Sequence, residues 1–230
     1  MMMQSRNAPG KRGYADVYQT LKDDIQYLRL MPGSVIRESD LIRDFGCSRT
    51  PIREALLRLS GEYLVDIYPQ RGMYVSRIDF PLAAEVAYMR HILDSDICLS
   101  LCRQHTSLQS SVDEVFYFMS TAVKNRDVVR YIQMDNAFHR AIFTAAGRER
   151  IWSIISNSRA PYNRVLVLDL SMDNNLERSY GEHQKIAKYI ETGNEEELRK
   201  ILEVHHDHLP SPGYEEKIRA QFPQYFDGEA

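Results

Sequence analysis

The sequence is poor in cysteine. Its 230 residues contain only three, at positions 47, 98 and 102. The number is odd and lacks the paired spacing of a zinc knuckle, which argues against a disulfide framework and a thiolate zinc site. Cys98 and Cys102 lie one helical turn apart in an apolar stretch, which favours two core residues over a redox or metal-binding pair. So few thiols fit a reducing cytoplasm.

Long apolar runs and sequence repeats are also missing. No stretch approaches the roughly 18 apolar residues of a membrane span, and the polar residues 1–12 lack the apolar segment of a signal peptide. There is no internal repeat or low-complexity tract. We therefore expect a cytoplasmic protein with no membrane partner.

The net charge is only −3 at pH 7, but the charges are distributed unevenly. Residues 1–78 contain 12 Lys and Arg against 9 Asp and Glu, a net charge of +3. Residues 79–230 contain 17 against 23, a net charge of −6. A local basic excess is typical of a domain that binds nucleic acid, so the first third of the chain is where we expect a DNA contact.

The apolar pattern predicts a mainly α protein of two domains. Residues 14–78 show helical spacing followed by two β-prone runs, whereas residues 79–209 show helical patterns alone. The polar residues 1–13 are expected to form a mobile N-terminal arm, and residues 210–230 a C-terminal tail. The predicted architecture is an N-terminal winged helix-turn-helix with a small β-hairpin and a C-terminal helical bundle.

The first domain carries the signature of a helix-turn-helix. After a helix over 14–28, a short helix with Ser39 as its N-cap ends at Gly46, and the next begins near Thr50, an N-cap candidate followed by proline. Two short helices joined by a tight glycine turn define the motif. The β-prone runs 63–68 and 73–78 then predict a hairpin with an arginine at its tip, the wing.

The helix after the turn has one apolar face and one basic face. Its apolar stripe anchors it to the domain and consists of Ile52, Ala55, Leu56 and Leu59. Arg53 lies on the other side, with Arg49 before the first turn. A guanidinium can bind guanine or a phosphate in a bidentate manner, and the free N–H groups of a helix N-terminus favour phosphate. The alternative is an ordinary solvated face, which the adjacent turn and hairpin make less favoured.

This segment resembles the DNA-binding domain of the GntR family over residues 14–78. The resemblance rests on Pro32-Gly33, Leu41, Gly46, the run Ser48-Arg49-Thr50-Pro51-Ile52-Arg53-Glu54-Ala55-Leu56, Leu59 and Arg71-Gly72. It implies that Arg49 and Arg53 contact operator bases or phosphates, that Ser48 and Thr50 contact the backbone, and that Arg71 with Gly72 enters the minor groove. Cys47 departs from the aliphatic residue common there.

Four ionisable residues of the second domain lie in the middle of apolar helical stripes. They are Asp135 and His139, spaced i and i+4, together with His183 and His205. Burying a carboxylate and three imidazoles is costly unless they are paired or bind a metal. Each histidine alone is better explained as a hydrogen-bonded core residue, but the four together predict a site for a divalent ion such as Zn, Ni, Mn or Fe.

The second domain resembles the FCD effector-binding domain of the FadR subfamily. The resemblance rests on Asp135-Asn136-Ala137-Phe138-His139, Glu182-His183 and the Leu198, Leu202, His205 spacing. It implies a helical bundle that holds a metal through one Asp and three His, with a small organic acid beside it. Arg90 and Arg164 are the candidates for an effector carboxylate, although surface or bundle salt bridges are an equal alternative. Asp94, where Glu is common, and Arg148, where Asn is common, depart from the pattern.

Three functions are compatible with these features. The favoured one is a homodimeric transcription regulator, in the repressor role, that binds palindromic operator DNA under the control of a small organic acid. In the second, the metal ion itself is the effector. The third, a metal-dependent hydrolase, is disfavoured because no general base such as the Glu of a His-Glu-x-x-His motif accompanies the ligands. We therefore do not expect an enzyme.

Overall fold

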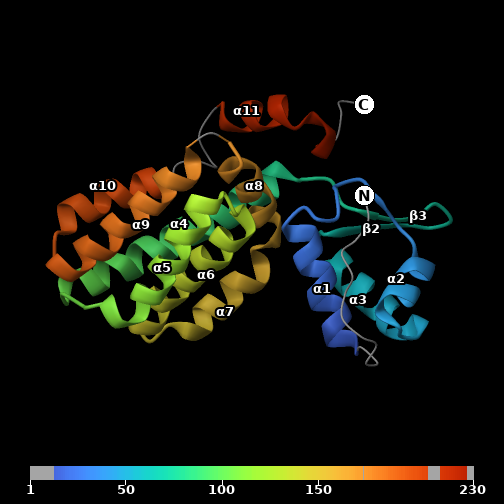
Figure 1. Cartoon of the computed structure of the whole chain (residues 1–230), viewed down its shortest axis with the longest axis horizontal. Helices are drawn as coiled ribbons and strands as arrows, with labels where there is room; N and C mark the ends of the chain where they lie inside the picture. Colours follow the sequence, from blue (N-terminus) through green and yellow to red (C-terminus); the bar gives the residue numbers. More distant parts are fainter. Residues whose placement is uncertain (1–12, 173, 207–212, 227–230) are drawn as a thin grey trace. The chain divides into compact units, whose positions relative to one another are not determined.

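The computed structural model of the chain divides into two compact units, Met1–Arg77 and Ile78–Ala230. It describes residues 13–172, 174–206 and 213–226. Each unit is helical, and the first also contains a small sheet (Figure 1). The mainly α fold expected from the sequence is confirmed. The N-terminal arm expected over residues 1–13 lies almost wholly outside the described residues.

The first unit is a winged helix-turn-helix. Its elements are α1 (Tyr14–Gln26), β1 (Val35–Ile36), α2 (Glu38–Phe45), α3 (Arg49–Gly61), β2 (Val65–Tyr68) and β3 (Gly72–Val75). The strands form an antiparallel sheet in the order β1-β3-β2. The two-residue strand β1 was not predicted. It follows the turn at Gly33 and extends the hairpin by one short edge strand, Val35 pairing with Tyr74.

The turn between α2 and α3 is tight because Gly46 adopts a left-handed conformation, φ +63°, that ends α2. Helix α2 begins at Glu38 with Arg37 as N-cap, so the prediction of Ser39 as N-cap was wrong by two residues. Helix α3 begins at Arg49 with Ser48 in the N-cap position. Thr50 is therefore not the N-cap, and Arg49 lies within the first turn.

The predicted apolar stripe of α3 is fully buried. Ile52, Ala55, Leu56 and Leu59 are each at most 1% exposed, and α3 packs on the apolar face of α1, formed by Val17, Leu21 and Ile25. Each buried aliphatic side chain contributes about 1.5–3 kcal/mol relative to exposure. This packing holds α3 with its opposite face, and the arginines on it, toward solvent.

The second unit is all helical. Its elements are α4 (Phe80–Arg103), α5 (Gln109–Asn125), α6 (Val128–Ala145), α7 (Glu149–Ser158), α8 (Ala160–Leu170), α9 (Asn175–Thr192), α10 (Glu195–His206), α11 (Tyr214–Gln221) and the 3₁₀ turn η1 (Pro223–Tyr225). Helix α4 packs against α6, α8, α9 and α10 (Figure 1). Cys98 and Cys102 are buried on α4, as expected of core residues.

Part of the predicted C-terminal tail is folded. Ile218 of α11 and Phe226 after η1 are buried, and the backbone N–H of Ile78 donates to the carbonyl of Tyr225 at 2.9 Å. The ring of Tyr214 lies 6.1 Å from that of Phe80. The end of the described chain therefore packs against the beginning of the helical unit.

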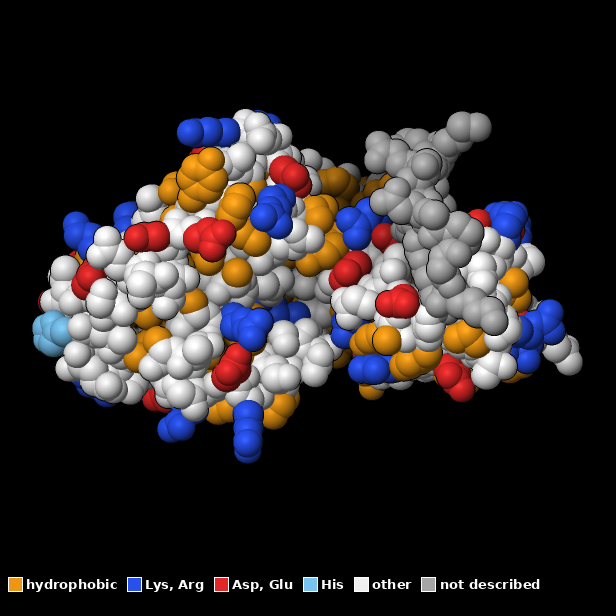
Figure 2. Space-filling view, turned by 60° about the horizontal axis from the view of Figure 1, so that its bottom comes forward, with side chains coloured by type: hydrophobic (Ala, Val, Ile, Leu, Met, Phe, Trp, Pro, Cys, Tyr) orange, Lys and Arg blue, Asp and Glu red, His pale blue; other side chains and the backbone are white. Residues whose placement is uncertain are grey.

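The surface of the helical unit is mixed in character. Hydrophobic side chains reach it between charged ones of both signs (Figure 2). They include Tyr88 and Ile92, which lie one turn apart on α4 and are 62% and 47% exposed. Among the described residues, no helix combines the length and the apolar character needed to cross a membrane.

Candidate metal centre and DNA-binding surface

The four predicted metal ligands come together inside the helical unit. Asp135 and His139 lie one turn apart on α6, His183 lies on α9 and His205 on α10. One ligand atom from each lies within 4.8 Å of the others. Asp135, His139 and His183 are at most 3% exposed. The sequence pattern therefore identified four side chains that the packing of three helices brings to one point.

The ligand atoms face one another closely. The Nε2 atoms of His139 and His183 are 3.3 Å apart. Oδ1 of Asp135 lies 3.2 Å from Nε2 of His183 and 3.6 Å from Nε2 of His139. Carboxylate oxygen and imidazole nitrogen are the donor atoms that borderline divalent ions take in proteins.

Each histidine has a polar side chain near its other ring nitrogen. Nδ1 of His139 lies 3.0 Å from the Asp94 carboxylate, and Nδ1 of His205 lies 2.9 Å from Glu182. The third partner is the hydroxyl of Tyr131, 3.1 Å from Nδ1 of His183. Such partners fix the tautomer and the orientation of ligating imidazoles. They fit rings that hold the proton on Nδ1 and present the bare Nε2 to an ion.

The local electrostatics keep the carboxylate charged and two of the imidazoles neutral. Burial alone would raise the pKa of Asp135, but the charges of Arg90 and Arg159 hold it well below its ordinary value. Burial, reinforced by Arg90, lowers the pKa of His139 to about 3, and burial lowers that of His205 to about 4. Metal binding requires these protonation states.

The residues present fit a divalent cation. With the Nδ1 atoms protonated, the lone pairs of two Nε2 atoms converge on an ionised carboxylate within about 3.6 Å. That arrangement is repulsive unless a proton or a cation lies between the atoms. One Asp and three His would hold the ion, and the outer residues Asp94, Tyr131 and Glu182 would orient them.

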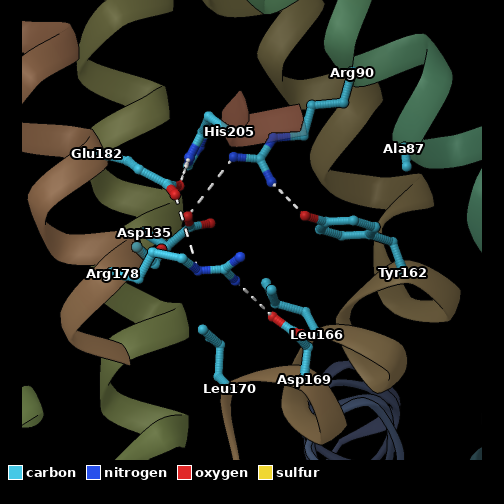
Figure 3. A pocket seen from close by; sticks show the side chains of 11 residues that line it. Ala87, Arg90, Asp135, Tyr162, Leu166, Asp169, Leu170, Arg178, Glu182 and His205 are labelled. Atoms are coloured by element: carbon cyan, nitrogen blue, oxygen red, sulfur yellow. Dashed lines mark hydrogen bonds and ion pairs between the residues drawn. The ribbon is translucent and has the colours of Figure 1, made fainter. Parts of the chain in front are cut away.

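A small pocket adjoins this cluster. Asp135 and His205 form part of its wall, and Arg90, Tyr162 and Arg178 project toward it from α4, α8 and α9 (Figure 3). Arg90 is 2% exposed. It donates through Nε to Asp94 and through Nη1 to the hydroxyl of Tyr162, both at 3.1 Å.

The remaining nitrogen of Arg90 is available at the cavity. Its Nη2 lies 3.7 Å from Oδ1 of Asp135, beyond hydrogen-bond distance, and has no hydrogen-bond partner within the described part of the chain. A buried guanidinium with an unused donor beside a cavity suits an anionic group. This is the chemistry expected of an effector contact.

The two predicted effector residues differ in position. Arg90 lines the cavity, whereas Arg164 is fully buried on α8 and does not line it. An effector contact by Arg164 therefore remains a prediction. Tyr162 and Arg178 were not predicted from the sequence, because nothing in their local pattern distinguishes them from other residues of amphipathic helices.

A further buried arginine supports Asp135 from behind. Arg159, 1% exposed, donates from Nη2 to Oδ2 of Asp135 at 3.0 Å and from Nη1 to the amide oxygen of Asn136. Oδ1 of the same carboxylate faces the histidines. Arg159 therefore leaves one oxygen of Asp135 for the ligand cluster and fixes its direction.

The predicted DNA-contacting residues are all exposed. Ser48, Arg49, Thr50 and Arg53 lie at the N-terminal end of α3, where unpaired helix N–H groups favour a phosphate. Arg71 lies in the turn between β2 and β3, next to Gly72, and its carbonyl accepts from the hydroxyl of Tyr74. Glu38 of α2, which was not predicted as a site residue, contacts both Arg49 and Arg53.

A winged helix-turn-helix with exposed arginines on its second helix defines a DNA-binding regulator. Residues 13–75 match the family described as bacterial regulatory proteins, gntR family, and residues 85–208 match the FCD domain. The chain belongs to the GntR family of bacterial transcription regulators and carries an FCD domain. It is a regulator and not an enzyme.

Relatives that match about three quarters of the chain or more are regulators as well. An uncharacterized HTH-type transcriptional regulator in an unstable DNA locus of Streptomyces ambofaciens is 26% identical, with 96% of this chain and 92% of that protein covered. The HTH-type transcriptional repressor RspR of Escherichia coli K12 is 21% identical over 89% and 90%. The gluconate operon transcriptional repressor of Bacillus licheniformis is 23% identical over 76% and 74%.

Solved structures share the fold. Escherichia coli McbR/YncC superimposes with a TM-score of 0.70 at 19% identity, covering 92% of this chain and 98% of the other. A GntR transcriptional regulator from Rhodococcus sp. RHA1 gives a TM-score of 0.69 at 20% identity, covering 93% and 99%. Both likenesses concern the arrangement of the elements.

Proposed function

We propose that this protein is a homodimeric repressor whose affinity for operator DNA is controlled by a small organic acid, bound beside a divalent ion in the helical unit. The observation that carries this proposal is the convergence of Asp135, His139, His183 and His205 next to a cavity that Arg90 lines. The proposed DNA-binding and effector domains are 14–78 and 79–209.

The metal part of the proposal is supported by the chemistry of the site. The donor set combines one carboxylate with three imidazoles. These donor atoms are compatible with Zn, Ni, Mn or Fe as the bound ion. When bound, the ion supplies a positive charge that attracts an acid group into the cavity. The chain's own contribution is to hold Asp135 ionised through Arg90 and Arg159, and to orient each imidazole from its Nδ1 side.

The effector part is supported by Arg90. Its unused Nη2 can donate to a carboxylate, and the Tyr162 hydroxyl, which accepts from Arg90, still has its own proton to donate. Relatives whose names describe them as repressors, one of them of a gluconate operon, favour repression and make D-gluconate a suitable first compound to test.

The DNA and dimer parts are supported by the helix-turn-helix. Arg49 and Arg53 are the proposed base or phosphate contacts, Ser48 and Thr50 the backbone contacts, and Arg71 with Gly72 the minor-groove contact. Regulators of this type match a two-fold symmetric operator with a two-fold symmetric dimer. For repression to be relieved, the effector must bind the two arrangements of the DNA-binding units with different affinities.

Elemental analysis of the purified whole chain and thermal unfolding in a panel of organic acids, D-gluconate included, test the proposal. An acid present at 100 times its Kd should stabilise the metal-loaded protein by about 2.7 kcal/mol. The variant Arg90→Lys keeps the charge but loses the planar fork, so its acid-dependent shift should fall. The matched control Arg140→Lys, exposed on α6, should keep it.

Two outcomes change the conclusion. The effector mechanism would be contradicted if the purified protein held no divalent ion and none of the acids changed its unfolding temperature. If removal of the ion by a chelator changes the affinity for operator DNA and no organic acid changes it, the ion itself is the effector. The complete set of four converging protein ligands is the observation that keeps this second candidate open.

A further inference from the structure

Glu38, the first residue of α2, makes ion pairs with the two arginines proposed to contact DNA. Its Oε1 accepts from Nε of Arg53 at 2.8 Å, and its Oε2 lies 3.4 Å from Nε of Arg49. The carboxylate is 19% exposed, whereas the side chains of Arg53 and Arg49 are 58% and 65% exposed. One partly covered carboxylate therefore contacts two solvent-facing guanidinium groups.

The atoms involved give this contact its significance. Both ion pairs use the Nε edge of the guanidinium, which leaves the two terminal nitrogens of each fork unoccupied by Glu38. Those terminal nitrogens are the ones that bind guanine or clamp a phosphate in a bidentate manner. Arg49 and Arg53 lie one turn apart on α3, so their forks leave the same face of the helix.

We propose that Glu38 is a positioning residue for DNA recognition, which fixes Arg49 and Arg53 before the operator arrives. This inference rests on the proposed DNA contacts of those two arginines and goes beyond them. An exposed arginine loses much rotamer freedom when it binds. A carboxylate that holds both Nε atoms reduces that loss, and preorganisation of this kind strengthens the complex with the cognate site.

The negative charge of Glu38 opposes DNA binding, whereas its positioning of the arginines favours it. A carboxylate close to the phosphate backbone weakens binding to every duplex, because the repulsion is independent of sequence. If Glu38 only masked the arginines, its removal would strengthen binding to all DNA. If it positions them, its removal weakens binding to the cognate duplex alone, and the signs of the two effects differ.

Two substitutions separate charge from position. Glu38→Gln removes the charge and leaves only one acceptor oxygen for two Nε donors. Glu38→Asp keeps the charge on a side chain one methylene shorter, which cannot reach both arginines in the same way. Under a positioning role both variants lose specificity, whereas under a charge role Glu38→Asp behaves as the wild type.

A matched control is available in the same helical turn. Asp40 also places a carboxylate in the first turn of α2, where its negative charge interacts favourably with the helix dipole. Unlike Glu38, it forms an ion pair with Arg43, at 3.2 Å. The variant Asp40→Asn therefore reproduces the loss of charge near the N-terminus of α2. It leaves the contacts of Arg49 and Arg53 with Glu38 in place.

The experiment uses the whole chain and a duplex that the wild type selects from a random-sequence library, with a scrambled duplex of the same length as the second probe. We expect Glu38→Gln and Glu38→Asp to weaken binding to the selected duplex about tenfold. Binding to the scrambled duplex should be unchanged or tighter. Asp40→Asn should keep the wild-type ratio of the two affinities, and circular dichroism melts verify that each variant is folded.

The possible failures are distinguishable. An unchanged affinity ratio in folded Glu38→Gln and Glu38→Asp, or tighter binding of Glu38→Gln to both probes, would overturn the positioning role. Arg49→Gln and Arg53→Gln report separately on the proposed contacts. If these two variants bind the selected duplex as the wild type does, the assignment of the DNA-binding arginines fails, whatever Glu38 does.

Discussion

The Nε2 atoms of His139 and His183 lie 3.3 Å apart, although the two residues come from different helices. Two bare imidazole nitrogens at this distance repel each other, and two protonated ones would clash. A shared proton or a shared metal ion removes the conflict. The distance is therefore compatible with one hydrogen bond between the two rings or with a common ion, and the proposed metal site rests on the second arrangement.

Removal of an outer carboxylate should weaken metal binding without removing a ligand. Glu182→Gln replaces the carboxyl partner of His205 Nδ1, and we expect metal affinity to fall about 10–100-fold. Competition with a chromophoric chelator measures it. Glu177→Gln, an exposed position on the same helix, should match the wild type, and an equal effect of the two variants would contradict the outer-shell role.

The metal-free protein should lose stability as the pH falls from 7 to 5. His139 and His205 have pKa values of about 3 and 4 in the folded state, against 6.5 when unfolded. In this window the unfolded chain binds more protons, so lowering the pH favours unfolding by about 2 kcal/mol for each histidine at pH 5. Urea titrations measure this slope. The variant His205→Gln should show a shallower one, and equal slopes would count against the assignment.

Two glycines of the DNA-binding unit should respond oppositely to alanine. Gly46 has φ +63° with no atom within 4 Å of an added Cβ, so Gly46→Ala should destabilise this unit by about 1 kcal/mol through backbone strain alone. Gly61 lies at the end of α3 with a negative φ, and here too no atom lies within 4 Å of an added Cβ. Gly61→Ala should therefore leave the stability unchanged or raise it. Thermal melts of the whole chain compare the two.

The wing arginine should contribute to affinity through charge. Arg71→Ala should weaken DNA binding. The slope of log K against log salt concentration should also fall in magnitude by about one, because one counterion fewer is released. Binding titrations at several salt concentrations measure the slope. Arg140→Ala, an exposed arginine of the helical unit, should leave the slope as it is. If both variants behave as the wild type, Arg71 makes no phosphate or groove contact.

Local periodicity made the helices predictable, and it also identified the four residues proposed as metal ligands. Asp135 and His139 stand out in sequence because ionisable side chains occupy the centre of an apolar stripe. The same rule located His183 and His205. The limits of α2 and α3 were harder to predict, because Ser39 and Thr50 are good N-cap residues that the chain places one or two residues inside the helices.

The supporting residues could not be found in this way. Asp94, Tyr131 and Glu38 act through contacts between different helices, so no spacing along one helix reveals them. Helix α11 was missed for a related reason. It is short and polar, and its burial depends on Ile218 docking onto the rest of the helical unit rather than on a repeating apolar pattern.

The hydrogen bond from Ile78 to the carbonyl of Tyr225 has a practical consequence for engineering. A truncated chain that ends at residue 208, where the FCD match ends, would lose Phe226 and the ring of Tyr214 that lies next to Phe80. Residues 78–226 instead form a cassette whose two ends lie side by side. Residues up to 226 should therefore be kept when the helical unit is produced alone or joined to another DNA-binding domain.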